Sequence, residues 1–266
     1  MILDKIAADT RIRVEEAKKA VSPEEMKARA LQMNSSTGFP FEKVFQAPGL
    51  HFICEVKKAS PSKGLIAADF PYVEIAREYE RAGAGAISVL TEPHFFQGSN
   101  EYLREIRGAV SLPILRKDFT IDSYQIYEAK TIGADAVLLI AALLDGAAIQ
   151  EYIYLCDILG LSALVEVHDE SELMTAVHAG ARLVGVNNRN LKDFTVNLGN
   201  SLRLRELAPR KIPFIAESGI KTSEDVARLY NKGVNGILVG ETLMRAQDKG
   251  AMLRTLAAGG GCMNEN

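Results

Sequence analysis

Four times along the chain, a helical pattern ends at a glycine that leads directly into an apolar run. These glycines are Gly83, Gly133, Gly180 and Gly233. A glycine just past a helix end adopts the left-handed conformation without the penalty that a Cβ atom would impose. The four junctions therefore predict helices that stop and feed strands, in units that repeat structure without an obvious repeat of sequence.

Eight apolar runs of strand length alternate with amphipathic helical patterns. The runs span residues 51–56, 86–90, 112–115, 136–142, 162–167, 183–186, 213–216 and 236–239, and helical patterns between them include 72–81, 123–131, 149–159, 170–179 and 223–231. Strict alternation implies parallel pairing, and near-continuous apolar strands imply burial on both faces. The pattern predicts an α/β fold, a (β/α)8 TIM barrel. A doubly wound open sheet is disfavoured because no GxGxxG motif follows the first strand.

Residues 1–47 precede the first strand and carry two helical patterns, at 2–20 and 23–35. Ser22 is the expected N-cap of the second helix, with Glu25 three residues later. A segment of this length is too short for a core of its own. We therefore expect one barrel domain over residues 1–266, with 1–47 as an N-terminal helical extension packed on the barrel at its mouth.

The composition excludes several classes of protein. The chain has 266 residues, is 47% hydrophobic and carries a net charge of -3, with basic and acidic residues interspersed, so no nucleic-acid partner is expected. No signal peptide or membrane span is evident. Cys54, Cys156 and Cys262 are widely spaced, which indicates neither a disulfide framework nor a zinc site. We expect a cytoplasmic protein without a metal or a membrane partner, and a monomer, with an oligomer left open.

The first predicted strand ends in charges that a buried strand should not carry. With a period of two residues, Glu55 and Lys57 share the face of Ile53. A buried ion pair without further function is the structural alternative, but such pairs seldom improve on hydrophobic packing. A functional carboxylate and ammonium are favoured.

Polar residues also end the other strands, where a TIM barrel carries its active site. The suspects at the strand ends are Glu55, Lys57, Lys117, Glu166, Asn187, Glu217, Ser218 and Gly240. Several carboxylates and ammoniums converging on one mouth would be costly to bury without a ligand. The pattern predicts a catalytic site there.

Two glycine motifs indicate what the mouth binds. Ser218-Gly219 follows the seventh strand and Gly240-Glu241 follows the eighth, where such barrels build phosphate sites from backbone amides. A small phosphorylated substrate is expected. Phe96 and Leu138 are candidates for an apolar wall against an aromatic ring, although packing alone would also explain either.

Six motifs in combination resemble the indole-3-glycerol phosphate synthase family of tryptophan biosynthesis. They are Glu55-Val56-Lys57-Lys58-Ala59-Ser60-Pro61-Ser62, Leu90-Thr91-Glu92, Pro113-Ile114-Leu115-Arg116-Lys117-Asp118-Phe119, Leu164-Val165-Glu166-Val167-His168, Gly185-Val186-Asn187-Asn188-Arg189 and Ala216-Glu217-Ser218-Gly219-Ile220. The resemblance spans nearly the whole chain and includes the N-terminal extension. It implies a lyase that converts 1-(2-carboxyphenylamino)-1-deoxyribulose 5-phosphate to indole-3-glycerol phosphate, releasing carbon dioxide and water without a metal or cofactor.

The resemblance also implies roles for individual residues. Lys117 would be the general acid and Glu166 the general base, with Lys57 paired to the substrate carboxylate. The supporting residues would be Glu55 and Glu217, which hold the lysines, Asn187 and Ser218, which bind and position substrate, Arg189 as a further carboxylate ligand, and Ser60, Gly219, Gly240 and Glu241 around the phosphate.

Three further expectations concern side chains of this site. Glu241 stands where some relatives carry serine, so its side chain is expected to point away from the phosphate. Two lysines in one partly dry pocket are expected to lower each other's pKa. His168, like the other three histidines, is expected to have a surface or capping role.

Two other functions compete with this hypothesis. A phosphoribosylanthranilate isomerase or a related sugar-phosphate isomerase would use the same scaffold, but its chemistry typically needs Cys or Asp near the first strand end, where this chain has Glu55-Val56-Lys57. A noncatalytic phosphate-binding barrel acting as a partner subunit is the second alternative. It is disfavoured because every acid–base candidate is present.

Overall fold

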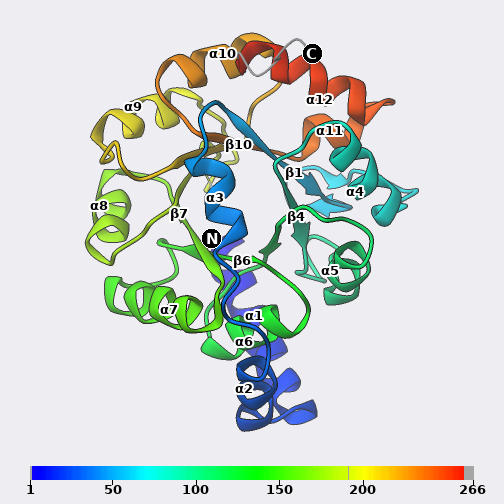
Figure 1. The fold of residues 1–266 in the computed structure, drawn as a ribbon, viewed down its shortest axis with the longest axis vertical. Coiled ribbons are helices and arrows are strands. Elements are labelled where there is room, and N and C mark those ends of the chain that lie inside the picture. The colour runs from blue at the N-terminus through cyan, green and yellow to red at the C-terminus, as the bar shows by residue number, and fades with distance from the viewer. Residues whose placement is uncertain (1, 191, 261–266) are drawn as a thin grey trace.

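The computed structural model describes residues 2–190 and 192–260, and its centre is a closed barrel of eight parallel strands (Figure 1). In chain order the strands are β1 (His51–Val56), β4 (Ala86–Leu90), β5 (Ile114–Lys117), β6 (Ala136–Ile140), β7 (Ser162–Val167), β8 (Val184–Asn187), β9 (Phe214–Glu217) and β10 (Gly236–Val239). Each pairs with its neighbours in chain order, and β10 pairs with β1 to close the barrel. The prediction of a TIM barrel is confirmed.

Helices alternate with the strands and form the outer ring. They are α4 (Tyr72–Arg81), α5 (Asn100–Arg107), α6 (Ser123–Thr131), α7 (Gly146–Leu159), α8 (Glu170–His178), α9 (Gly199–Leu207), α10 (Ser223–Asn231), α11 (Glu241–Arg245) and α12 (Lys249–Ala257), followed by the 3-10 turn η1 (Ala258–Gly260). The four junction glycines that precede strands have φ angles of 91°, 91°, 89° and 79°. These left-handed values confirm the predicted helix stops. No described helix is long and apolar enough to cross a membrane.

The alternation of side chains along each strand separates two apolar layers. Ile53 of β1 faces the barrel interior with Leu115, Leu138 and Ile215. Phe52, Cys54 and Val56 face outward, where they pack with apolar side chains of the surrounding helices, as in a typical barrel of this class. The predicted faces of β1 are therefore correct, and Glu55 and Lys57 lie on the interior side.

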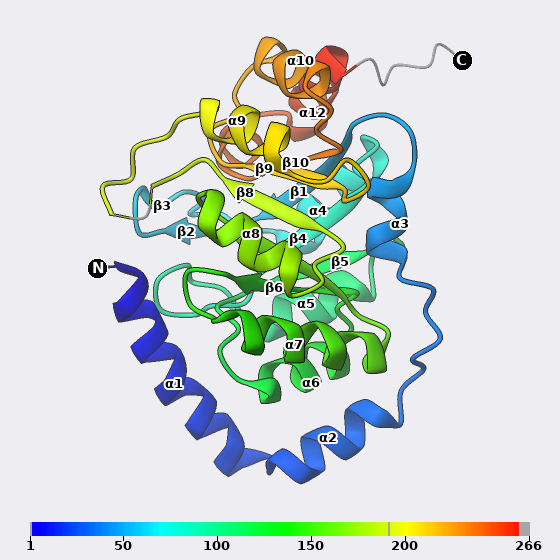
Figure 2. The same ribbon diagram turned by 90° about the vertical axis from the view of Figure 1, so that its left-hand side faces the viewer.

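The N-terminal extension contains three helices, not the two that the sequence predicts. They are α1 (Ile2–Ala20), α2 (Pro23–Leu31) and α3 (Pro40–Gln46). The second helix ends four residues earlier than expected. Figure 2 shows α1 and α2 running along the outside of the barrel and α3 on the opposite side from the start of α1.

The extension contacts both ends of the barrel. Phe41 and Phe45 of α3 are fully buried in the interior layer, and the rings of Phe45 and His51, the first residue of β1, lie 6.3 Å apart. Helix α3 thus closes the N-terminal end. Ile6 of α1 reaches the cavity at the C-terminal end, as expected for a segment over the mouth. A two-stranded antiparallel hairpin, β2 (Ala59–Ser60) and β3 (Gly64–Leu65), follows β1.

Candidate active site

A cavity of about 900 Å³ opens at the C-terminal ends of the strands. It is large enough for a small-molecule ligand. The structure brings every predicted site residue to its wall: Glu55, Lys57, Ser60, Phe96, Lys117, Leu138, Glu166, Asn187, Arg189, Glu217, Ser218, Gly219, Gly240 and Glu241. The mouth of this barrel is therefore a polar pocket with an apolar part.

Lys117, the last residue of β5, lies between two carboxylates inside the cavity. Its Nζ is 2.9 Å from Glu166 Oε2 and 3.3 Å from Glu217 Oε2. Burial disfavours the ammonium, but the negative charges of Glu166, Glu217 and Glu55 outweigh burial and raise the pKa of Lys117. The expectation that a neighbouring lysine would lower the pKa of Lys117 is wrong, because the negative charges of the carboxylates around Lys117 raise it.

The two carboxylates beside Lys117 differ in protonation. Burial favours the neutral acid in both, but Lys117 and then His168 keep the pKa of Glu166 well below its usual range. For Glu217, burial together with the charges of Glu166 and Glu55 raises the pKa to about 7, against the opposing effect of Lys117. Glu217 Oε1 is buried without a hydrogen-bond partner in the described structure. The site thus holds one carboxylate whose pKa is lowered and one whose pKa is raised.

Two further polar groups of the cavity come from the ends of β1 and β8. Lys57 Nζ donates to Glu55 Oε1 across the end of β1. Asn187 Nδ2 donates to Glu166 Oε1 over 3.3 Å, and Asn187 Oδ1 accepts the backbone N–H of Arg189 over 3.0 Å. Asn187 therefore has its amide directed at the carboxylate that Lys117 also binds.

The rim of the cavity is made by the turns after β9 and β10. Ser218 and Gly219 both have left-handed backbones, with φ of 68° and 84°, and left-handed strain at a non-glycine residue clusters at functional sites. Glu241 opens α11, where the first backbone N–H groups have no intrahelical partner. These turns present amide donors to one side of the cavity.

The expectation that Glu241 turns its side chain away from the phosphate stays a prediction. In the structure, Glu241 is paired with three cations. The carboxylate of Glu241 lies 3.5 Å from Lys63 Nζ, 3.8 Å from Arg189 Nη2 and 3.3 Å from Arg245 Nε. Three cations from three separate segments draw it toward the rim, and all of them line the cavity. The sequence signals only the pair with Arg245, four residues along α11, because Lys63 and Arg189 lie far from Glu241 along the chain.

Apolar side chains form the opposite part of the wall. The rings of Phe96 and Phe119 lie 5.9 Å apart, and Leu138 projects into the barrel interior. Glu92 fixes the loop that carries Phe96 by accepting the backbone N–H groups of Phe95 at 2.7 Å and of Phe96 at 2.9 Å. The wall can receive an aromatic ring.

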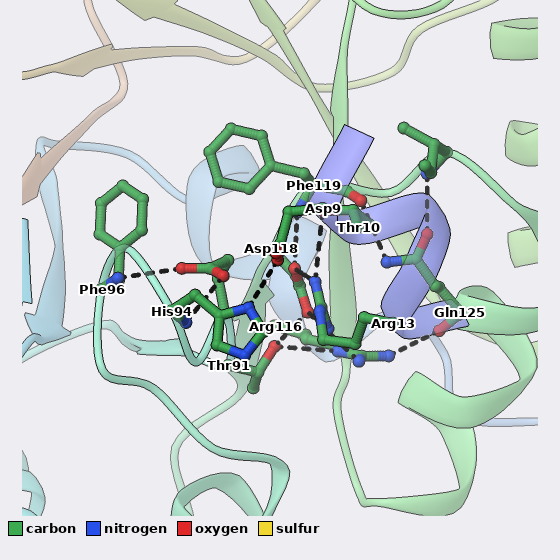
Figure 3. Close-up of polar contacts among 12 residues, drawn as sticks. Asp9, Thr10, Arg13, Thr91, His94, Phe96, Arg116, Asp118, Phe119 and Gln125 are labelled. Carbon is green, nitrogen blue, oxygen red and sulfur yellow. Dashed lines mark hydrogen bonds and ion pairs between the residues drawn. The ribbon is translucent and has the colours of Figure 1, made fainter. Parts of the chain in front are cut away.

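A buried polar network ties α1 to the end of β5 (Figure 3). Arg13 donates to both carboxylate oxygens of Asp118, at 3.1 and 2.7 Å, and Thr91 Oγ1 donates to the same carboxylate at 2.7 Å. Arg116 lies 3.3 Å from Asp118 as well. Asp118 directly follows Lys117, so the network fixes the chain next to the central lysine. Arg13 and Asp118 were not among the predicted site residues.

Asp9, Glu92 and His94 form the one group of metal-type donors found among the described residues, with donor atoms within 4.8 Å of one another. His94 Nδ1 is 2.7 Å from Asp9 Oδ2. Both Glu92 oxygens already accept backbone N–H groups. The group is thus explained as a contact between α1 and the loop after β4. Cys54 and Cys156 are buried free thiols, and Cys262 lies outside the described residues.

Comparison with known proteins agrees with this geometry. A family model described as indole-3-glycerol phosphate synthase matches residues 3–256. A relative of that name from Ruminiclostridium cellulolyticum is 59% identical over 96% of this chain and 98% of its own length, and one from Endomicrobium trichonymphae is 54% identical over 96% and 99%. A solved 3-hexulose-6-phosphate synthase superposes with a TM-score of 0.62 at 16% identity, covering 79% of this chain and 99% of that one, which shows the fold alone.

The closed barrel and its polar mouth define a TIM-barrel enzyme with an acid–base site. More particularly, the chain belongs to the indole-3-glycerol phosphate synthase family. The resemblance read from the sequence motifs is confirmed. The chain is accordingly a carbon–carbon lyase of tryptophan biosynthesis that acts on a small phosphorylated substrate.

Proposed function

We propose that Lys117 and Glu166 are the general acid and general base of the family's ring closure. The observation that carries the proposal is the 2.9 Å contact between Lys117 Nζ and Glu166 Oε2 inside the cavity. The arene carbon that bears the carboxylate attacks the ketone, and Lys117 protonates the oxygen that becomes a hydroxyl. Loss of carbon dioxide restores the aromatic ring. Loss of the hydroxyl gives an iminium, and Glu166 then removes the proton whose departure forms the indole.

Lys57 would pair with the substrate carboxylate and, with Lys117, assist departure of the hydroxyl. Its contact with Glu55 supports this role, because the hydrogen bond holds the amino group of Lys57 at the wall of the cavity. Asn187 would hydrogen-bond the developing oxyanion or hydroxyl, and Glu217 would orient Lys117. The electron sinks are a protonated carbonyl and an iminium, so the mechanism calls for no metal or organic cofactor.

The phosphate would lie at the rim between the turns after β9 and β10. Ser60, Gly219, Gly240 and the backbone of Glu241 would surround it, and Ser218 would position the remainder of the substrate. Arg189 would bind a carboxylate or the phosphate of the substrate after its ion pair with Glu241 is broken. Phe96 and Leu138 would contact the aromatic ring. We further propose that the chain is cytoplasmic and that it is a monomer. Sedimentation of the purified protein would test the oligomeric state.

The direct test is indole fluorescence after mixing the protein with the carboxyphenylamino-deoxyribulose phosphate in buffer that contains a chelator. The chain has no Trp, so product fluorescence has little background. Lys117→Ala and Glu166→Gln should each lose turnover by about 10²-fold or more. Lys58→Ala, outside the cavity, is the matched control and should keep it.

The possible results separate the proposals. Substrate binding without turnover in the unaltered protein would favour the noncatalytic phosphate-binding barrel. Turnover that survives both substitutions would refute the assigned acid and base while leaving the lyase activity intact. Loss of activity on chelation would contradict a metal-free mechanism.

A further inference from the structure

His168 lies two residues beyond Glu166 and continues the interior face of β7. Its Nε2 is 3.6 Å from Glu166 Oε1. The side chain is only 17% exposed, and Nε2 is buried without a hydrogen-bond partner in the described structure. A surface or capping role, which the sequence suggests, does not account for a buried ring nitrogen directed at the carboxylate.

Glu172, in the first turn of α8, holds the imidazole ring from its other side. Glu172 Oε2 accepts the backbone N–H of His168 over 2.7 Å and lies 3.1 Å from the ring Nδ1. Asn200 of α9 donates to the carbonyl of His168 over 2.9 Å. With Nδ1–H bound to Glu172, the ring can turn only its Nε2 toward Glu166. Contacts from two helices, α8 and α9, thus hold the ring and the backbone of this histidine.

We propose that His168 is a positioning residue for the general base: held by Glu172, it orients the Glu166 carboxylate and favours its ionised form through a charge on the side opposite Lys117. The inference rests on the function proposed above for Glu166. His168 does not line the cavity, so it acts on substrate only through Glu166. Neither the family comparison nor the substrate chemistry assigns it this part.

The charges around the ring agree with a cationic His168. Burial lowers its pKa, but the bond to Glu172 and the charges of Glu166 and Glu217 outweigh burial and raise the pKa. The titratable groups that face the ring are Glu166 on β7, Glu172 on α8 and Glu217 on β9, with Lys117 on β5 beyond Glu166. The groups nearest the imidazole ring are therefore carboxylates, and the one cation named, Lys117, lies beyond Glu166.

The test is the pH profile of kcat for His168→Gln. The base must be ionised, so activity is lost as pH falls through the pKa of Glu166. Removing the neighbouring positive charge raises that pKa, and the acid limb should move upward by about one pH unit. The value of kcat at neutral pH should fall roughly tenfold because the carboxylate is less well oriented, while KM stays unchanged. His178→Gln, at the exposed end of α8, is the matched control.

Glu172→Gln keeps an acceptor oxygen for the histidine and removes only the charge that favours the imidazolium. It should move the acid limb in the same direction by a smaller amount, and it decides the question if His168→Gln does not fold. Unaltered acid limbs in the folded variants would overturn the inference. Glu166→Gln is measured in parallel: if it keeps full turnover, the proposed base itself is wrong, whatever the histidine variants show.

Discussion

Lys117 shows how a residue's neighbours change what its type alone suggests. Two lysines in a pocket predict mutual repulsion, but Glu166 and Glu217 raise the pKa of Lys117. As the proposed general acid, Lys117 would release its proton only when the reaction creates negative charge on the ketone oxygen. The change in charge on the substrate would then determine when the proton is transferred, because the surrounding carboxylates keep it on the lysine until that point.

Substitution of Lys117 by Arg separates charge from proton donation. Arginine can retain the ion pairs with Glu166 and Glu217, but it does not give up a proton in proteins. Turnover should fall by about 10²- to 10⁴-fold while the melting temperature changes little. Rapid-mix fluorescence and thermal unfolding on the same sample provide the two measurements. Near-normal turnover would exclude Lys117 as the donor.

Residue-level prediction from sequence succeeded where strand periodicity decides and failed where distant segments meet. Periodicity placed Glu55 and Lys57 inside the barrel, and the same period of two applied to Glu166 would also have indicated His168. In contrast, the position of Glu241 also depends on Lys63 and Arg189, which no local pattern brings to it; only Arg245, four residues along the same helix, is a local partner.

At the scale of elements, α1 is fastened to the barrel by the Arg13–Asp118 contact. Arg13→Met should leave Asp118 with Arg116, Thr91 and the backbone N–H of Phe119. It should cost about 2 kcal/mol of stability because two charge-assisted hydrogen bonds are lost. The value of KM should rise, since Ile6 of the same helix lines the cavity. Urea unfolding and steady-state kinetics measure the two effects. Lys19→Met, on the exposed face of α1, is the control.

The same contact predicts how acid affects α1. Burial raises the pKa of Asp118, but Arg13 and Arg116 outweigh burial and hold it below the usual range. A carboxyl group with a lowered folded-state pKa stabilises the fold above its unfolded pKa, and that stability is lost as pH falls through the folded value. Protection of the α1 amides from hydrogen exchange, corrected for the intrinsic rate, should therefore decline only at strongly acidic pH. An early decline near pH 6 would contradict this assignment.

Element boundaries were predictable where glycine or a capping residue marks them. The ranges of α4, α6 and α10 agree with their patterns, as does the N-cap of α2 by Ser22. Helix α3 was missed because it follows an N-cap residue, Phe39, with a left-handed φ of 53° and no side-chain cap. Its stability comes from burial of Phe41 and Phe45, which a local pattern does not reveal.

At the scale of the whole molecule, the two ends of the barrel have different roles: the C-terminal ends of the strands carry the cavity, and the N-terminal end is packed with apolar side chains. Phe45 fills the N-terminal end, far along the strands from the cavity. Phe45→Ala should cost about 3–5 kcal/mol of unfolding free energy through the space it leaves, with kcat and KM retained at temperatures where the variant is folded. Chemical denaturation measures the loss. Ile12→Ala, at a side chain 66% exposed, should stay within about 0.5 kcal/mol.

An added Cβ atom at Gly185 would collide with the carboxylate of Glu217, and one at Gly240 with that of Glu55, so each glutamate would have to leave its position in the cavity. The acidic groups of the cavity therefore also serve as packing for the barrel's own backbone. A lineage that replaced Glu217 with a smaller residue would open space for alanine at position 185. Once that methyl group was fixed, restoring the glutamate would meet a steric barrier. The loss of Glu217 would then be hard to reverse, because the alanine at position 185 blocks its return, although position 185 does not contact the substrate.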